Sequence, residues 1–298
     1  MITLDKLKIV TNIQTINVCD ETRFEFIEKN GRLSSLKYYQ EHPFLLMIKV
    51  DYECREVVIE FSGKVLGKDY PKLISKDTIR QCFEAINELG LIEIDIDAMM
   101  DAEVVKCDVT KDIPVNDVKQ VTDYICSHIK NYRQFICRKL KNGNTVVEKN
   151  VVNREYKKRM MIYDKEKEMC RSANRPFLDK HGLEGAFSGM CRFELNLNSK
   201  EQIRKSLRIA DTRLMTVLSA DADPITDFLD EVVEPQDAVT MTDKKAYMTM
   251  LVLKDCDFDL ENVEAKMRAF HRSKGTVISK VRMTVSQMAW EEPSPKAR

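Results

Sequence analysis

The chain has 298 residues, of which 43% are hydrophobic and 32% charged, a composition that excludes an intrinsically disordered protein and suits one large domain or two smaller ones. Its formal net charge is zero, but the charges are segregated: residues 130–171 contain 13 Lys or Arg and 5 Asp or Glu, whereas residues 220–264 contain 3 and 13. A basic block of this kind is typical of a surface that binds a polyanion such as nucleic acid.

The cysteines and the hydropathy of the sequence indicate in which cellular compartment the protein is expected. The nine cysteines form an odd set without a Cys-x-x-Cys pair, which indicates reduced core residues of a cytosolic protein. No apolar run approaches the roughly 20 residues that cross a bilayer, and the N-terminus lacks a signal-peptide pattern. We therefore expect a cytoplasmic protein without a membrane partner.

The first part of the chain mixes strand and helix patterns. Apolar and polar residues alternate, and so predict strands, at residues 2–11, 23–27, 44–52, 55–61 and 103–110. Residues 62–68 are expected to form a Gly- and Lys-rich loop without P-loop spacing, either a plain turn or a basic loop on phosphates. Residues 75–89 predict a helix with Ser75 as its N-cap, and Pro114 is expected to open a second helix.

The next part predicts a basic hairpin and two further strands. Residues 134–140 and 145–152 flank an Asn-Gly-Asn turn, and residues 158–165 and 190–197 alternate as strands. Residues 170–189 are expected to form a polar loop rather than core.

From residue 199 onward the pattern is helical. Together the elements predict an α+β fold, in which an antiparallel β-sheet core has helices packed on one face and is followed by a mainly helical C-terminal subdomain. The expected boundary separates residues 1–198 from residues 199–298.

Period-two alternation places chemically reactive side chains on one face of three strands. These side chains are Asp108, Tyr163, Lys165 and Glu194. If the three strands belong to one sheet, we expect the four side chains to converge on one surface. The alternative is that they lie on ordinary water-exposed sheet faces, where polar residues need no function.

Four short stretches resemble the replication initiation proteins of the gene II and gene X family, known from filamentous phages, rolling-circle plasmids and related mobile elements. The stretches are residues 57–67, 106–110, 161–168 and 191–195. They follow the order of the family, and the four together are more specific than any one alone.

The resemblance implies an endonuclease that nicks and rejoins one DNA strand at a replication origin and so begins rolling-circle replication. In the family, a tyrosine of a Tyr-x-Lys segment attacks a phosphodiester, which gives a 5′-phosphotyrosine and a free 3′-hydroxyl. That tyrosine is Tyr163 here, with Lys165 as the neighbouring cation and Tyr156 as the fallback. A host helicase and polymerase, and the cytoplasm of a bacterial host, are the implied partners and compartment.

A metal ion suits this chemistry, because the phosphate oxygens gain charge in the transition state. Mg²⁺ or Mn²⁺ prefers carboxylate ligands, so Asp108 and Glu194 are the expected metal ligands, with Asp112 as a further acidic partner. The four histidines are isolated in the sequence, unlike the paired metal-binding histidines of many rolling-circle nickases.

Basic side chains around these segments are expected to contact DNA. They are Lys64, Arg138, Lys139, Lys141, Lys157, Lys158, Arg159 and Arg192. An alternative function of a different class is a non-catalytic DNA-binding regulator, which would use the same basic residues and leave the carboxylates with a structural role.

Overall fold

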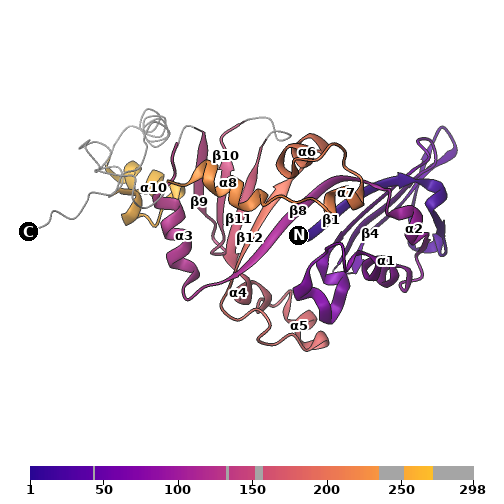
Figure 1. Cartoon of the computed structure of the whole chain (residues 1–298), viewed down its shortest axis with the longest axis horizontal. Helices are drawn as coiled ribbons and strands as arrows, with labels where there is room; N and C mark the ends of the chain where they lie inside the picture. Colours follow the sequence, from indigo (N-terminus) through magenta and orange to yellow (C-terminus); the bar gives the residue numbers. More distant parts are fainter. Residues whose placement is uncertain (43, 132–133, 152–156, 235–251, 271–298) are drawn as a thin grey trace, which may run out of the picture. The chain divides into compact units, whose positions relative to one another are not determined.

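The structure is a computed structural model that describes residues 1–42, 44–131, 134–151, 157–234 and 252–270. Ten strands belong to one large antiparallel sheet accompanied by helices, which confirms the expected α+β class (Figure 1). The chain divides into two compact units. Unit 1 is Met1–Lys111, Met169–Phe187 and Glu194–Pro224, and unit 2 is Asp112–Glu168, Ser188–Phe193 and Ile225–Arg298. The expected boundary at residue 198 is therefore not the boundary between these units, since residues 199–224 group with the N-terminal strands.

Six strands of unit 1 are hydrogen-bonded in the order β3-β4-β5-β6-β1-β8. Their bounds are β1 Leu4–Asn12, β3 Glu25–Lys29, β4 Arg32–His42, β5 Leu45–Asp51, β6 Glu56–Ser62 and β8 Glu103–Pro114, the end of which belongs to unit 2. A separate small sheet pairs β2 (Ile16–Val18) with β7 (Ile92–Ile94). The helices are η1 Ile13–Thr15, η2 Glu21–Arg23, η3 Gly63–Lys72, α1 Ile79–Asn87, α2 Ile96–Met99, α5 Arg175–His181, α6 Lys200–Leu207 and α7 Leu214–Leu218.

The two faces of the sheet in unit 1 differ in polarity, because side chains alternate along each strand. On one face Leu7 and Ile9 of β1 lie opposite Phe61 and Ile59 of β6, and all four are fully buried. Helix α1 packs on this face, where the rings of Phe83 and Phe61 meet edge-on with centroids 6.0 Å apart. The opposite face is thereby left to polar side chains.

Helix α1 begins one turn later than the expected cap at Ser75. The Thr78 hydroxyl accepts a hydrogen bond from Ser75 N at 2.8 Å and donates one to Leu73 O at 2.7 Å. Ser75 and Thr78 are thus both used in a turn that precedes the helix.

Strand β8 runs to Pro114, the residue that was expected to open a helix. Proline lacks the N–H that a sheet ladder uses, and it fits here because it is the last residue of the strand. The helix that follows, α3 (Val118–Ser127), starts after Asp117, whose carboxylate accepts a hydrogen bond from Lys119 N at 2.8 Å.

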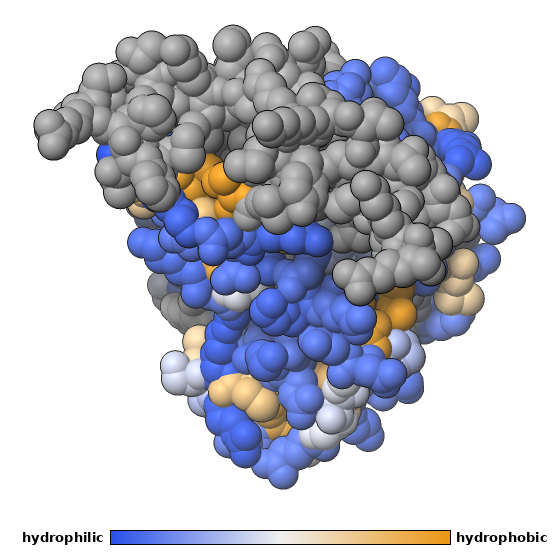
Figure 2. Space-filling view, turned by 90° about the vertical axis from the view of Figure 1, so that its left-hand side faces the viewer, coloured by the Kyte–Doolittle hydropathy of each residue, from blue (hydrophilic) through white to orange (hydrophobic). Residues whose placement is uncertain are grey.

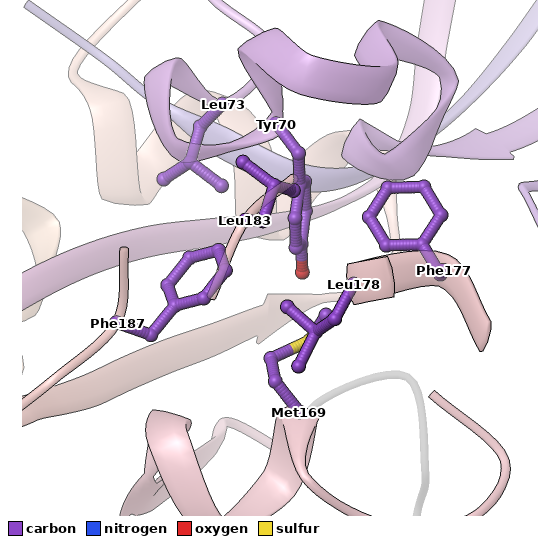
Figure 3. Packing of buried hydrophobic residues seen from close by; sticks show 7 residues of the cluster. All are labelled: Tyr70, Leu73, Met169, Phe177, Leu178, Leu183 and Phe187. Carbon is purple, nitrogen blue, oxygen red and sulfur yellow. The ribbon is translucent and has the colours of Figure 1, made fainter. Parts of the chain in front are cut away.

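The segment at residues 170–189 is not the polar loop that was expected. It contains α5 and buries four apolar side chains against Tyr70 of η3, Leu73 directly after η3, and Met169 (Figure 3). The four side chains are Phe177, Leu178, Leu183 and Phe187. The expected loop at residues 62–68 is likewise largely part of η3, in which Val65 and Leu66 are buried.

Unit 2 contains three strands in the order β11-β10-β9, with bounds β9 Phe135–Lys139, β10 Thr145–Lys149 and β11 Arg159–Asp164. Strand β12 (Met190–Leu197) contributes its first half to unit 2 and its second half to unit 1. Within the described residues, the helices of this unit include α3, α4 Lys165–Met169, α8 Pro224–Val232 and α10 Leu260–Phe270.

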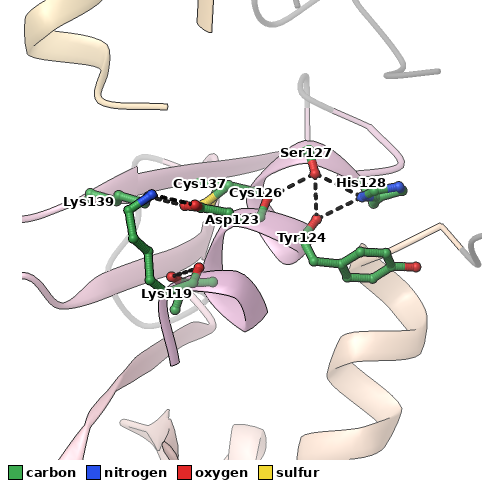
Figure 4. The surroundings of a disulfide bond; sticks show 9 residues. Lys119, Asp123, Tyr124, Cys126, Ser127, His128, Cys137 and Lys139 are labelled. Carbon is green, nitrogen blue, oxygen red and sulfur yellow. Dashed lines mark hydrogen bonds and ion pairs between the residues drawn. A yellow bond between two sulfur atoms is a disulfide. The ribbon is translucent and has the colours of Figure 1, made fainter. Parts of the chain in front are cut away.

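Helices α3 and α8 cover one face of the strands of unit 2. A disulfide joins Cys126 of α3 to Cys137 of β9 (Figure 4). The rings of Phe135 (β9) and Phe228 (α8) meet edge-on, with centroids 5.9 Å apart. The expectation that all nine cysteines are reduced is therefore wrong for this pair. Sequence spacing gave no sign of it, because the pairing depends on how α3 packs against the hairpin.

Candidate active site

Asp108 lies in unit 1, on the polar face of β8, where β1 pairs Lys6 directly opposite it. Its carboxylate is 3% exposed. Asn196 of β12 donates a hydrogen bond from Nδ2 to Asp108 Oδ1 at 2.7 Å, and Lys6 Nζ lies 3.8 Å from Asp108 Oδ2. Three strands therefore contribute to the surroundings of this carboxylate.

Glu194 is two residues before Asn196 in β12, so the two side chains project from the same face of the strand. Glu194 is 2% exposed. Burial disfavours the charged ammonium of Lys6, but the negative charges of Asp108, Glu194, Asp5 and Glu60 outweigh this effect and raise the pKa of Lys6. Both predicted metal ligands, Asp108 and Glu194, thus attract the positive charge of Lys6.

Burial also raises the pKa of Asp108, despite the opposing effects of Lys6 and Asn196. A carboxylate kept where its charge is disfavoured is a candidate for function rather than for stability. Two partly desolvated carboxylates suit Mg²⁺ or Mn²⁺, which takes one or two protein carboxylates and completes its shell with water and phosphate oxygens. Among the described residues, no group of three or more His, Cys, Asp or Glu suits a metal ion, so the fit depends on this pair.

Tyr163 and Lys165 lie together in unit 2, although not in one strand. Strand β11 ends at Asp164, and Lys165 is the first residue of α4. Lys165 is buried, and its Nζ lies 5.7 Å from the centroid of the Tyr163 ring and 2.7 Å from Glu168 Oε2. The four residues that were expected on one surface therefore belong, in pairs, to two units.

Asp164, next to the tyrosine, has a defined role. Its carboxylate accepts a hydrogen bond from Lys167 N and pairs with Lys167 Nζ, both at 3.0 Å. The residue therefore caps the first turn of α4, which accounts for a carboxylate beside a candidate nucleophile. Tyr156, the fallback nucleophile, lies outside the described residues.

The pleat divides the predicted DNA contacts of unit 2 between the two faces of the sheet. Lys139 projects toward α3 and pairs with Asp123 (Figure 4). Lys158 projects toward α8, with its Nζ 3.8 Å from Glu231. These two lysines are paired with acids of the covering helices, and their strand positions place them on the face opposite Tyr163.

The face of Tyr163 carries the other basic side chains. Arg159 lies four residues before Tyr163 in β11 and directly opposite Glu148 of β10. Arg138 Nη2 and Lys157 Nζ lie 2.9 and 3.0 Å from Glu148 Oε1, so both belong to the same face. The described surface seen from the side of α3 and α10 is mainly hydrophilic (Figure 2).

Three other predicted DNA contacts have different surroundings. Lys141 is exposed in the turn between β9 and β10. Lys64 donates to Asn174 Oδ1 at 2.6 Å, in unit 1. Arg192 is 0% exposed and donates from Nε and Nη2 to the two oxygens of Asp112, each at 2.6 Å. A side chain without exposed surface cannot contact DNA from this position, so Arg192 and Asp112 are reassigned to an ion pair in which Arg192 is buried and Asp112 is partly exposed.

Two of the histidines contact other protein groups. His128 Nδ1 is 2.8 Å from Tyr124 O and 2.9 Å from Ser127 Oγ (Figure 4). The His181 ring packs against Phe177 with centroids 4.6 Å apart.

Three residues of these sites escaped the sequence analysis. Lys6 and Asn196 follow the same alternation that identified Asp108 and Glu194, so the pattern contained them. Glu148 is one of the five acids within the basic block, and its pairing with Arg138 and Lys157 is not visible in the local sequence.

Within the described part of the chain, no helix has both the length and the apolar character needed to cross a membrane. The chain matches no protein-family model, no curated protein and no solved structure.

Proposed function

We propose that this protein nicks and rejoins one DNA strand at a replication origin and thereby initiates rolling-circle replication. The observation that carries this proposal is the pair of buried carboxylates, Asp108 and Glu194, on one polar sheet face. The raised pKa of Asp108 means that burial opposes its negative charge. A carboxylate that is kept under this cost is explained if it binds a metal ion in the reaction.

Tyr163 is the proposed nucleophile. Its phenolic oxygen forms a bond to phosphorus while the bond from phosphorus to the 3′ oxygen breaks, and the proton lost by the phenol balances the proton gained by the 3′-hydroxyl. A free tyrosine phenol, with a pKa near 10, is mostly protonated at neutral pH, so a neighbouring cation is needed to favour the phenolate. Lys165, with its ammonium 5.7 Å from the ring centroid, is the proposed cation.

Asp108 and Glu194 are the proposed ligands of Mg²⁺ or Mn²⁺. The bound ion would polarise the non-bridging phosphate oxygens and stabilise the charge that develops on them. Rejoining is the reverse reaction, in which the 3′-hydroxyl attacks the phosphotyrosine and releases Tyr163. Between the two steps the free 3′-hydroxyl is a primer for a host polymerase, and a host helicase would open the duplex ahead of it in the bacterial cytoplasm.

One observation favours the alternative of a non-catalytic DNA-binding regulator. Lys6 already supplies a positive charge to both carboxylates. A sheet that supplies its own counter-ion to these acids has less need of a metal ion. The two functions therefore differ in whether the protein depends on a divalent ion.

The test is a nicking assay on a supercoiled plasmid that carries the origin of the element encoding this protein. We expect nicked circles with Mg²⁺ or Mn²⁺, none with EDTA, and a loss of about 100-fold or more in Asp108→Asn and Glu194→Gln, since each removes a metal ligand. Glu60→Gln is the matched control, because Glu60 lies on the same face but pairs with Lys8 and Lys106. Absence of nicking with either metal on a verified origin would favour the regulator.

A further inference from the structure

Glu148 is a buried carboxylate at the centre of a cationic cluster in unit 2. It lies in the middle strand, β10, and is 3% exposed. One of its oxygens, Oε1, pairs with both Arg138 Nη2 at 2.9 Å and Lys157 Nζ at 3.0 Å. Arg159 lies directly opposite it in β11.

The cluster has more positive charge than this single acid neutralises. Arg138, Lys157 and Arg159 contribute three charges against the one of Glu148. The Nε–H groups of Arg138 and Arg159 are buried, and within the described part of the chain neither has a hydrogen-bond acceptor. Buried donors without an acceptor are costly, so a cluster that keeps two of them beside an excess of positive charge is not saturated by Glu148 alone.

The geometry of the donors selects the anion. Guanidinium groups present several N–H donors in a plane and suit the oxygens of phosphate, and a lysine ammonium adds a point charge. The Arg138 side chain is 43% exposed, so an anion can reach the cluster from solvent. The cluster also shares the sheet face of Tyr163, which lies four residues after Arg159, or about 13 Å along a strand.

We propose that Arg138, Lys157 and Arg159 bind a backbone phosphate of DNA that flanks the phosphate attacked by Tyr163, and that Glu148 holds these cations in place as an internal anion. This inference rests on the proposed function and names the part of the sheet along which the substrate strand runs. Because the carboxylate and the phosphate attract the same cations, Glu148 weakens DNA binding while it orders the site.

The chain offers a matched control on the opposite face. Asp123 neutralises Lys139 of β9 and also pairs with Lys119 of its own helix, α3. Glu148→Gln and Asp123→Asn each remove one negative charge from unit 2, and each releases one cation of β9, Arg138 or Lys139, together with one further lysine. Only Glu148→Gln releases them on the face of Tyr163.

The experiment measures binding of the full-length protein to a fluorescein-labelled single-stranded oligonucleotide by anisotropy, in EDTA and at several salt concentrations. Glu148→Gln is expected to tighten binding by about tenfold and to steepen the salt dependence, while Asp123→Asn changes binding by less than about twofold. An equal effect of both variants, or weaker binding by a folded Glu148→Gln variant, would overturn the proposal.

A second pair of variants tests the proposal independently if Glu148→Gln does not fold. Arg159→Gln should weaken binding and lower the slope of the salt dependence by about one, whereas Lys158→Gln, on the opposite face, should not. Equal effects of these two variants would also overturn the proposal. Because EDTA excludes nicking, these results are independent of the proposed function: a phosphate site can be present in a protein that never cleaves DNA.

Discussion

The ammonium of Lys6 lies 3.8 Å from Asp108 Oδ2, on the polar face of unit 1 that also carries Glu194. Lys6 and a divalent ion would therefore compete for the same two negative charges. The affinity of the carboxylates for a metal ion should therefore depend on the charge of Lys6.

Removing the positive charge of Lys6 should strengthen metal binding. In Lys6→Met the carboxylates lose their internal counter-ion, and we expect Mn²⁺ to bind about tenfold more tightly, which corresponds to about 1.4 kcal/mol. Calorimetric titration of the full-length protein with Mn²⁺ measures this change. Lys8→Met is the control, because Lys8 pairs with Glu60 at 3.3 Å on the same face. Equal affinities of all three proteins would contradict a metal site at Asp108 and Glu194.

Asp108→Asn should stabilise the metal-free protein near neutral pH. Burial raises the pKa of Asp108 in the folded state, so the charged form costs stability above that pKa and the protonated form removes the cost as the pH falls. We expect a gain of about 1 kcal/mol, or roughly 2 to 4 °C in Tm, measured in EDTA, and a smaller gain at acidic pH.

Glu60→Gln should have the opposite sign. Although burial opposes its charge, Lys106 and Lys8 hold the pKa of Glu60 below its usual value, so its charge stabilises the fold and that contribution is lost as the pH falls. A destabilised Asp108→Asn variant at neutral pH, with Glu60→Gln unchanged, would show that Asp108 is retained for structure.

Gly67→Ala should destabilise unit 1. Gly67 has φ 56° and ψ −117°, a conformation that favours glycine, and an added Cβ would lie 3.0 Å from the His181 ring. We expect a loss of about 2 to 3 kcal/mol in urea unfolding, which combines strain and the contact with His181. Gly90→Ala, at φ 67° with no atom within 4 Å of the added Cβ, should lose only about 1 kcal/mol. Equal losses would mean that His181 does not pack on η3.

The disulfide can be tested by counting the cysteines that react with an alkylating reagent. Alkylation of the unfolded, unreduced protein should modify the seven free cysteines, and reduction should expose Cys126 and Cys137 as two more. Reduction should also lower the Tm, because the bond closes a short loop between α3 and β9 and such bonds contribute about 2 to 4 kcal/mol. Nine modified cysteines before reduction would show that the pair stays as thiols.

Local alternation was sufficient for part of the site. It placed Asp108 and Glu194 on polar strand faces, and the same pattern contains Lys6 and Asn196. Alternation also predicted the β9–β10 hairpin, because apolar residues at every second position mark the buried face of each strand.

Long-range partners explain most of the differences. Arg192 looked like a surface cation because its acceptor, Asp112, is distant in sequence, and the Cys126–Cys137 bond depends on how α3 packs. The core residues at 177–187 were hidden among polar neighbours, and their buried face exists only against η3. Such contacts cannot be read from period-two or helical spacing.

The central claim is that Tyr163 forms a covalent bond to DNA. The most direct measurement is mass mapping of the peptide that stays attached to the 5′ phosphate after the protein is incubated with its origin DNA and Mg²⁺ or Mn²⁺, then denatured and digested. We predict a phosphotyrosyl bond at Tyr163, its loss in Tyr163→Phe with DNA binding preserved, and its loss in EDTA. A covalent bond at Tyr156 that persists in Tyr163→Phe would contradict the assignment of the nucleophile, and a verified origin that never becomes attached would contradict the nicking function itself.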